Sequence, residues 1–197
     1  MAEVESTFRL EPGDPAAEFS LSDPRGGEYS FEDVAGDKGT ILFFACNHCP
    51  YVVHLAKQVG ELAEDYVDEG VNTVAIMSND VENYPADAPN LMGEFADENG
   101  WDFPYLYDET QEVALAYSAA CTPDFFVFDQ DGYLFYAGQF DSSRPGSEDP
   151  PSGDDIREAL DTLLAGQDLG ADPHPAAGCN IKWKAGNEPD YFTAKKK

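Results

Sequence analysis

Apolar and polar residues divide the first half of the chain into a strand, a helix and a second strand. Residues 40–45 form an uninterrupted apolar run, and residues 71–77 form a second, largely apolar run. Such runs are typical of central strands that are buried on both faces. Between them, from Pro50 to a stop signal at Gly70, apolar residues recur with the spacing of one helical face: Val52, Leu55, Ala56, Val59, Leu62, Ala63 and Tyr66. This pattern predicts a strand–helix–strand unit.

The flanking segments predict a mixed sheet around this unit. The pairs of short runs at 18–21 and 28–31 and at 125–128 and 133–136 are typical of two hairpins. Helical patterns cover 91–99, 109–117 and 156–164, with a loop at 78–90 and a short edge strand at 103–107. We expect an α/β domain over 1–166, in which a mixed central sheet has helices on both faces. Residues 167–197 are expected to form a tail, irregular apart from 179–183, that packs on the domain or trails from it.

The most informative feature of the composition is a large negative net charge. The 197 residues carry 39 Asp and Glu against 11 Lys and Arg, which gives a formal charge of −28. This charge argues against nucleic acid and anionic membranes as partners, since both would repel the protein. Acidic residues run through the whole chain, as in the salt-adapted cytosols of halophilic archaea. No apolar run approaches the ~18 residues of a membrane-spanning helix, and the acidic N-terminus lacks a signal core, so we expect a cytoplasmic protein.

Two of the four cysteines are separated by two residues, in the motif Cys46-Asn47-His48-Cys49, where the first strand ends and the long helix begins. The first turn of a helix offers unpaired N–H groups and the positive end of the helix dipole, which stabilise a thiolate on Cys46. His48 adds a donor or a positive charge. Cys49 can reach Cys46 within one turn, so a disulfide can close and reopen there.

The same pair of cysteines could instead bind a metal ion. Structural zinc sites use four ligands, commonly as two such pairs, and the chain has no second pair. Copper is better suited to thiolates combined with an imidazole. A copper-binding chaperone that uses Cys46, Cys49 and a histidine therefore stays as an alternative, whereas the redox interpretation requires neither a metal nor another cofactor.

A second motif, Cys121-Thr122-Pro123, precedes the strand at 125–128, and a proline in this position is a candidate for a cis peptide bond. Together with the Cys-x-x-Cys motif and the order of strands and helices, it resembles the thioredoxin fold. The opening segment 12–21 and the late motif 178–183 resemble those of peroxiredoxin-like, AhpC/TSA-related redoxins. The resemblance covers about residues 10–185.

This resemblance implies a role for each matching residue. Cys46 would be the exposed attacking thiolate, Cys49 the buried resolving thiol and Pro123 a cis-proline that faces them. Thr122 would offer backbone hydrogen bonds to an extended substrate chain. The implied function is a dithiol–disulfide oxidoreductase whose partners are protein or small-molecule disulfides and a cellular dithiol reductant. Cys121 and Cys179 are candidate auxiliary redox residues, with Cys179 as a partner of Cys121, or else ordinary buried thiols.

The sequence departs from the family patterns at several positions. Ala45 replaces the usual tryptophan before the first cysteine, and the position of His48 resembles the more oxidising members, such as protein disulfide isomerases. A peroxidatic cysteine normally follows a threonine by three residues, but Phe43 and Cys46 occupy that position for the two cysteines. The two arginines that follow the site offer no clear counterpart of the activating arginine. Thiol peroxidase is therefore the rival function.

Overall fold

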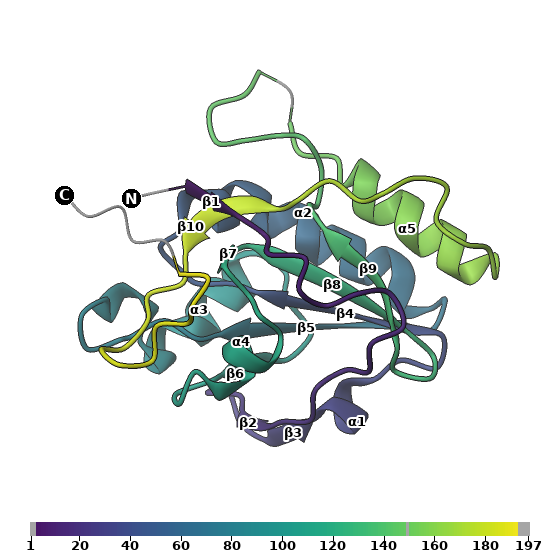
Figure 1. Ribbon diagram of the computed structural model, residues 1–197. Helices are drawn as coiled ribbons and strands as arrows, with labels where there is room; N and C mark the ends of the chain where they lie inside the picture. Colours follow the sequence, from purple (N-terminus) through teal and green to yellow (C-terminus); the bar gives the residue numbers. More distant parts are fainter. Residues whose placement is uncertain (1–2, 149, 193–197) are drawn as a thin grey trace.

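A seven-stranded mixed sheet forms the centre of the computed structural model, which describes residues 3–148 and 150–192 (Figure 1). The strands run in the order β3, β2, β6, β5, β4, β8, β9. Strand β4 pairs in parallel with β5 and antiparallel with β8, as the apolar runs predict for a central strand. The bounds are β2 (Ser20–Ser22), β3 (Glu28–Ser30), β4 (Gly39–Phe44), β5 (Val71–Met77), β6 (Tyr105–Tyr107), β8 (Asp124–Asp129) and β9 (Leu134–Gly138).

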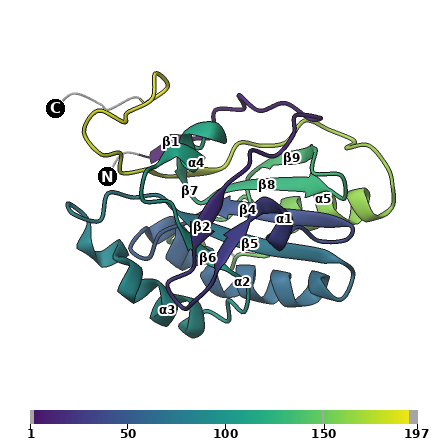
Figure 2. The same ribbon diagram turned by 90° about the horizontal axis from the view of Figure 1, so that it is seen from below.

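Helices cover both faces of this sheet, as Figure 2 shows from below. They are α1 (Phe31–Val34), α2 (Pro50–Val67), α3 (Pro89–Glu98), α4 (Glu112–Ala116) and α5 (Asp154–Leu164), with a 3₁₀ turn η1 (Pro85–Asp87). The alternation of side chains along β4 separates two cores. Ile41 and Phe43 pack with α2, α3 and α5, whereas Leu42 and Phe44 pack with α1 and α4.

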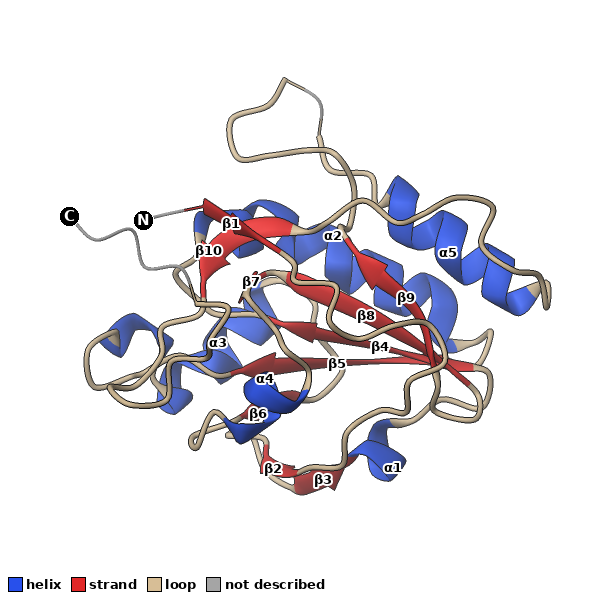
Figure 3. Cartoon of the chain, viewed as in Figure 1, coloured by secondary structure: helices blue, strands red, loops and turns tan. Residues whose placement is uncertain are grey.

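A second, three-stranded sheet joins the two ends of the described chain (Figure 3). Its order is β1 (Glu3–Glu5), β10 (Ala177–Asn180), β7 (Cys121–Thr122), and both pairings are antiparallel. The tail is irregular over 167–176, as expected, and its regular part is β10, which begins at Ala177 rather than Cys179 and ends at Asn180. These strands are two to four residues long, too short to leave a period-two pattern in the sequence.

The expected α/β class and order of elements are confirmed, with one correction in the sheet. The strand predicted at 103–107 is β6, which is not an edge strand, because β2 pairs with its outer side through Ser22 and Tyr107. The N-terminal hairpin of β2 and β3 thus extends the sheet beyond β6. Among the described residues, none of the helices has both the length and the apolar character needed to cross a membrane.

Candidate redox site at the start of helix α2

The two cysteines of the Cys-x-x-Cys motif lie in the turn between β4 and α2. Cys49 is the N-cap residue of α2, and Cys46 precedes it by three residues. Both are buried, with 1% of Cys46 and none of Cys49 exposed to solvent. The expectation of an exposed Cys46 is therefore wrong. Thr122 and His48 contact the thiol, with Cys46 Sγ 3.6 Å from Thr122 Oγ1 and 3.9 Å from His48 Nδ1.

The Thr122–Pro123 segment faces both thiols, and its peptide bond is cis, as predicted. The Cys49 thiol donates a hydrogen bond to the carbonyl oxygen of Thr122 at 3.1 Å. The hydroxyl of the same threonine contacts Cys46. The backbone and the side chain of Thr122 thus each engage one member of the pair, and the two distant sequence motifs form one site.

A carboxylate that sequence reasoning missed lies at the centre of this site. Asp87, at the end of η1, is completely buried. Its Oδ1 accepts hydrogen bonds from the backbone N–H groups of Asn47 (2.9 Å) and His48 (3.2 Å). Its Oδ2 lies 2.7 Å from His48 Nδ1 and accepts a bond from Asn79 Nδ2 at 2.8 Å. The amides between the two cysteines therefore donate to this carboxylate.

The His48 ring consequently lies closer to Asp87 than to the Cys46 thiol. Its Nδ1 is 2.7 Å from the carboxylate but 3.9 Å from Cys46 Sγ. The imidazole also stacks on the ring of Tyr84, with centroids 5.9 Å apart and planes inclined by 10°. The predicted contact between His48 and Cys46 exists, but Asp87 and Tyr84 are the residues that position the ring.

These neighbours shift the pKa of each thiol. Contact with the Cys49 thiol, burial and the charge of Asp87 raise the pKa of Cys46 well above its usual range. Hydrogen bonds from Cys179 and Cys46 lower the pKa of Cys49, and the same contact with Cys49 raises the pKa of Cys179. Among these three thiols, Cys49 is therefore the one whose pKa is lowered, while in its protonated form it donates to Thr122.

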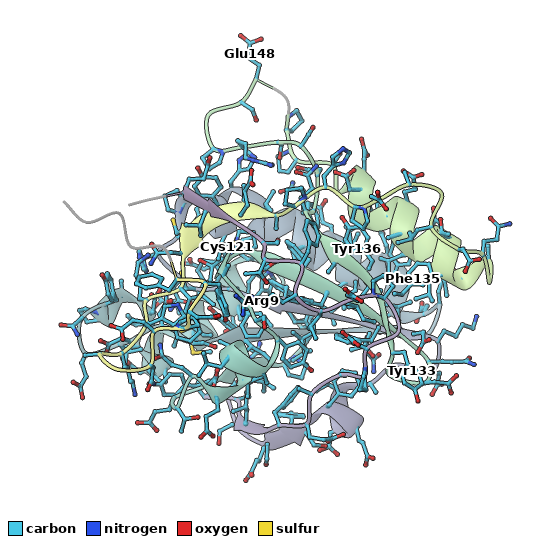
Figure 4. The ribbon with its side chains drawn as sticks, viewed as in Figure 1. Arg9, Cys121, Tyr133, Phe135, Tyr136 and Glu148 are labelled. Atoms are coloured by element: carbon cyan, nitrogen blue, oxygen red, sulfur yellow. The ribbon has the colours of Figure 1, made fainter. Side chains whose placement is uncertain are left out.

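The two remaining cysteines have different surroundings. In the antiparallel pair of β10 and β7, Cys179 lies opposite Thr122, and Asn180 lies opposite Cys121. Side chains alternate along a strand, so Cys179 shares the face of Thr122 and packs in the same core as Cys46 and Cys49. Cys121 lies at β7 beside β10 (Figure 4), and its thiol donates to the carbonyl oxygen of Pro123 at 3.3 Å. Of the two alternatives left open for these cysteines, this register disfavours a pair, because Cys121 and Cys179 lie at neighbouring register positions whose side chains leave opposite faces of the small sheet.

Three groups of the site also meet the spacing of metal ligands. The donor atoms of Cys46, His48 and Asp87 all lie within 4.8 Å of one another. The carboxylate is already engaged by four hydrogen-bonding groups, from Asn47, His48 and Asn79. A carboxylate saturated in this way is a poor ligand for soft Cu(I), which prefers thiolates. Copper would therefore have to use the thiols, with Asp87 left to orient His48.

Comparison with known proteins agrees with the fold. The sequence model of the AhpC/TSA family matches residues 12–137. The chain belongs to this family. A crystal structure of an uncharacterised conserved protein from Geobacillus kaustophilus superimposes with a TM-score of 0.90 and 49% identity, over 93% of this chain and 97% of that one.

Curated relatives of the chain are named as redox enzymes of two kinds. A Mycobacterium tuberculosis protein, assigned provisionally to the peroxiredoxins, is 29% identical over 143 residues, which cover 66% of this chain and 86% of that protein. The thiol-disulfide oxidoreductase ResA of Geobacillus kaustophilus is 30% identical over 121 residues, 61% of this chain and 64% of ResA. The chain is thus a thioredoxin-fold redoxin whose relatives include both of the predicted activities.

Proposed function

We propose that the protein is a thiol–disulfide oxidoreductase in which Cys46 attacks a partner disulfide and Cys49 resolves the mixed disulfide. The observation that carries the proposal is the convergence of both thiols on Thr122, at 3.6 Å for Cys46 and 3.1 Å for Cys49. The two cysteines lie on one turn ahead of α2, where a disulfide can close without displacing the helix.

The reaction balances over the two cysteines. The Cys46 thiolate attacks one sulfur of the partner, the partner S–S bond breaks, and the departing sulfur takes up a proton. Cys49 then attacks Cys46 Sγ, closes the Cys46–Cys49 bond and releases the second partner thiol. The partner gains two electrons and two protons, and the cysteine pair loses them. The preference for negative charge on Cys49 supports its role in the second step, which requires a thiolate.

The sequence around Cys46 favours this function over peroxide reduction. The raised pKa of Cys46 does not separate the two activities, because both start from the Cys46 thiolate. Phe43, however, occupies the position three residues before Cys46 where a peroxidatic site has a threonine. Both arginines that follow the site are engaged elsewhere. Arg144 donates to Gln139 and to nearby carbonyl oxygens, and Arg157 pairs with Asp65.

The proposed partners are disulfides of a protein or a small molecule and a cellular dithiol that reduces the Cys46–Cys49 bond again. We place this cycle in the cytoplasm. Four cysteines among 197 residues do not form the disulfide scaffold of small secreted domains, and a reducing compartment supplies the dithiol that the cycle needs.

Oxidation in two parallel arms tests the function. The reduced protein is exposed to oxidised glutathione or to hydrogen peroxide, quenched early by alkylation and mapped by mass spectrometry. We expect rapid closure of Cys46–Cys49 with the disulfide and slow reaction with peroxide. Cys46→Ser should abolish exchange and Cys49→Ser should retain a mixed disulfide on Cys46, while the control Cys121→Ser should behave as the wild type.

Two results would replace the proposal by one of its rivals. Fast peroxide oxidation through a sulfenic acid on one cysteine of the pair would establish a thiol peroxidase. Stoichiometric Cu(I) binding that requires Cys46 and Cys49, without disulfide exchange, would establish a copper chaperone.

A further inference from the structure

Strand β10 lies directly against the Thr122–Pro123 peptide. Cys179 is the register partner of Thr122, and Asn180 is the partner of Cys121. The approach is so close at Gly178 that a Cβ atom there would lie 2.2 Å from the carbonyl oxygen of Thr122. Only glycine allows the two backbones to meet at this distance.

This is the place where the resemblance to thioredoxins puts an extended substrate chain. Such a chain pairs through its backbone with the residue before the cis-proline, which is Thr122 here. In this protein, β10 already pairs with Thr122, and β1 pairs with the other edge of β10 through Glu3 and Cys179. The chain's own C-terminal segment therefore occupies the position of a bound substrate strand.

The residue that β10 brings to this position is a cysteine. Cys179 is 3% exposed, lies on the same face of the small sheet as Thr122, and packs in the core that contains Cys46 and Cys49. The Cys49 thiol lies 3.1 Å from the carbonyl oxygen of Thr122, the residue that Cys179 faces in the register of β10 and β7. Cys49 consequently has one sulfur neighbour within its own motif and a second one on β10.

We infer that β10 is a built-in substrate strand and that Cys179 is a third redox thiol, which exchanges with the Cys46–Cys49 disulfide to give a Cys49–Cys179 disulfide. This inference rests on the proposed function, which supplies the first disulfide. Cys179 Sγ attacks Cys49 Sγ, the Cys49–Cys179 bond forms, and the Cys46–Cys49 bond breaks. The proton of Cys179 passes to Cys46, so the total number of electrons and protons in the three thiols is unchanged.

The exchange allows Cys46 to return to a free thiol while the protein as a whole stays oxidised. In the Cys49–Cys179 form Cys46 is again a free thiol, while the oxidation is stored one strand away on the C-terminal segment. A separate substrate chain can pair with Thr122 only if β10 leaves, so a disulfide that reacts without displacing β10 must reach Cys46 from the side of His48 and Tyr84.

The Cys46→Ser variant isolates the second disulfide. The reduced variant is treated with diamide, a small dithiol oxidant, then alkylated, digested and analysed for linked peptides. We expect a Cys49–Cys179 disulfide. The variant with Cys46→Ser and Cys121→Ser should give the same linkage, because Cys121 faces away. The variant with Cys46→Ser and Cys179→Ser should give none.

Recovery of Cys49 and Cys179 as separately alkylated residues in folded Cys46→Ser would overturn the inference. Should that variant fail to fold, the wild type in glutathione redox buffers replaces it. Alkylation should then become blocked at Cys179 in a fraction of molecules whose Cys46 stays reactive, and full alkylation of Cys179 at every potential would refute the exchange. Failure of the proposed function is a different result, since the Cys46–Cys49 bond would then not close in the wild type.

Discussion

Removing the charge of Asp87 should make Cys46 considerably more acidic. The substitution Asp87→Asn keeps the shape of the side chain and an oxygen that can accept from the amides of Asn47 and His48. The carboxylate and Cys46 Sγ lie within 4.8 Å of each other. At an effective dielectric constant of ~20, two unit charges at that separation repel by about 3.5 kcal/mol. A repulsion of this size changes the ratio of thiol to thiolate by more than about a hundredfold.

We expect the pKa of Cys46 to fall in Asp87→Asn, and the alkylation of Cys46 at a fixed pH below that pKa to become faster by up to about two orders of magnitude. The assay is the pH dependence of iodoacetamide alkylation. It is performed with Cys49, Cys121 and Cys179 replaced by serine, so that only Cys46 reacts, and with the fold monitored by circular dichroism.

The matched control is Asp141→Asn. Asp141 is also a buried carboxylate that accepts from backbone amides, those of Ser143, Ser152 and Gly153, but it does not contribute to the raised pKa of Cys46. It should cost stability without changing the alkylation profile. An unchanged Cys46 pKa in folded Asp87→Asn would refute the assignment of Asp87 as the group that suppresses the thiolate, and an increase would mean that its hydrogen bonds outweigh its charge.

Three further properties follow from individual contacts. Because the pKa of Cys46 is raised, the rate of exchange with oxidised glutathione should climb about tenfold per pH unit from neutral pH to pH 9, and a plateau near neutrality would contradict this. Gly178→Ala should destabilise the protein by about 1–3 kcal/mol in urea unfolding, since the new Cβ meets Thr122, whereas Gly170→Ala, in open space, should not. Burial raises the pKa of Asp124 from 3.8 to about 6, so the folded state binds a proton more tightly there than the unfolded chain does. Stability should therefore rise by up to about 3 kcal/mol as the pH falls from 6 to 4, relative to Asp124→Asn, and the same pH profile in both proteins would exclude this role.

Hydrophobic patterning was sufficient to predict the central strands of the large sheet and its longest helix. The strand at 71–77 coincides with β5, and the helix from Pro50 coincides with α2 at its start. These elements are long and bury most of their apolar residues, so their periodicity is clear in the sequence. The pair Cys46 and Cys49 and the cis-proline Pro123 were likewise recognised, because their motifs carry the chemistry within three or four residues.

Asp87 and Cys179 reach the site through tertiary structure, and local sequence could not place them. Asp87 is one of 39 acidic residues and stands in a loop between two prolines, where nothing distinguishes it from a solvated carboxylate. Cys179 is carried to Thr122 by a strand of four residues whose partners, β1 and β7, are even shorter. The signal available for β10 was Gly178, since a glycine beside a cysteine is consistent with a close backbone approach.

Asn79 connects Asp87 to the segment that carries Cys179. Its Oδ1 accepts a hydrogen bond from the backbone N–H of Lys182, just beyond β10, and its Nδ2 donates to Asp87 Oδ2, both at 2.8 Å. Asn79→Ala would break both bonds and leave a buried amide and a buried carboxylate with one partner fewer. We expect the free energy of unfolding to fall by roughly 1–3 kcal/mol for each buried group that loses its partner. We also expect Cys179 and Cys46 both to be alkylated faster.

The comparison that makes this result specific is Asn83→Ala, which removes one bond to Asp80 at the edge of the same loop. It should leave both alkylation rates near those of the wild type. If Asn79→Ala exposed Cys179 without changing Cys46, β10 and the Asp87 loop would move independently. Joint exposure would mean that the C-terminal segment controls Cys46 in two ways, because it fills the substrate position beside Thr122 and also holds the carboxylate that keeps the thiol protonated.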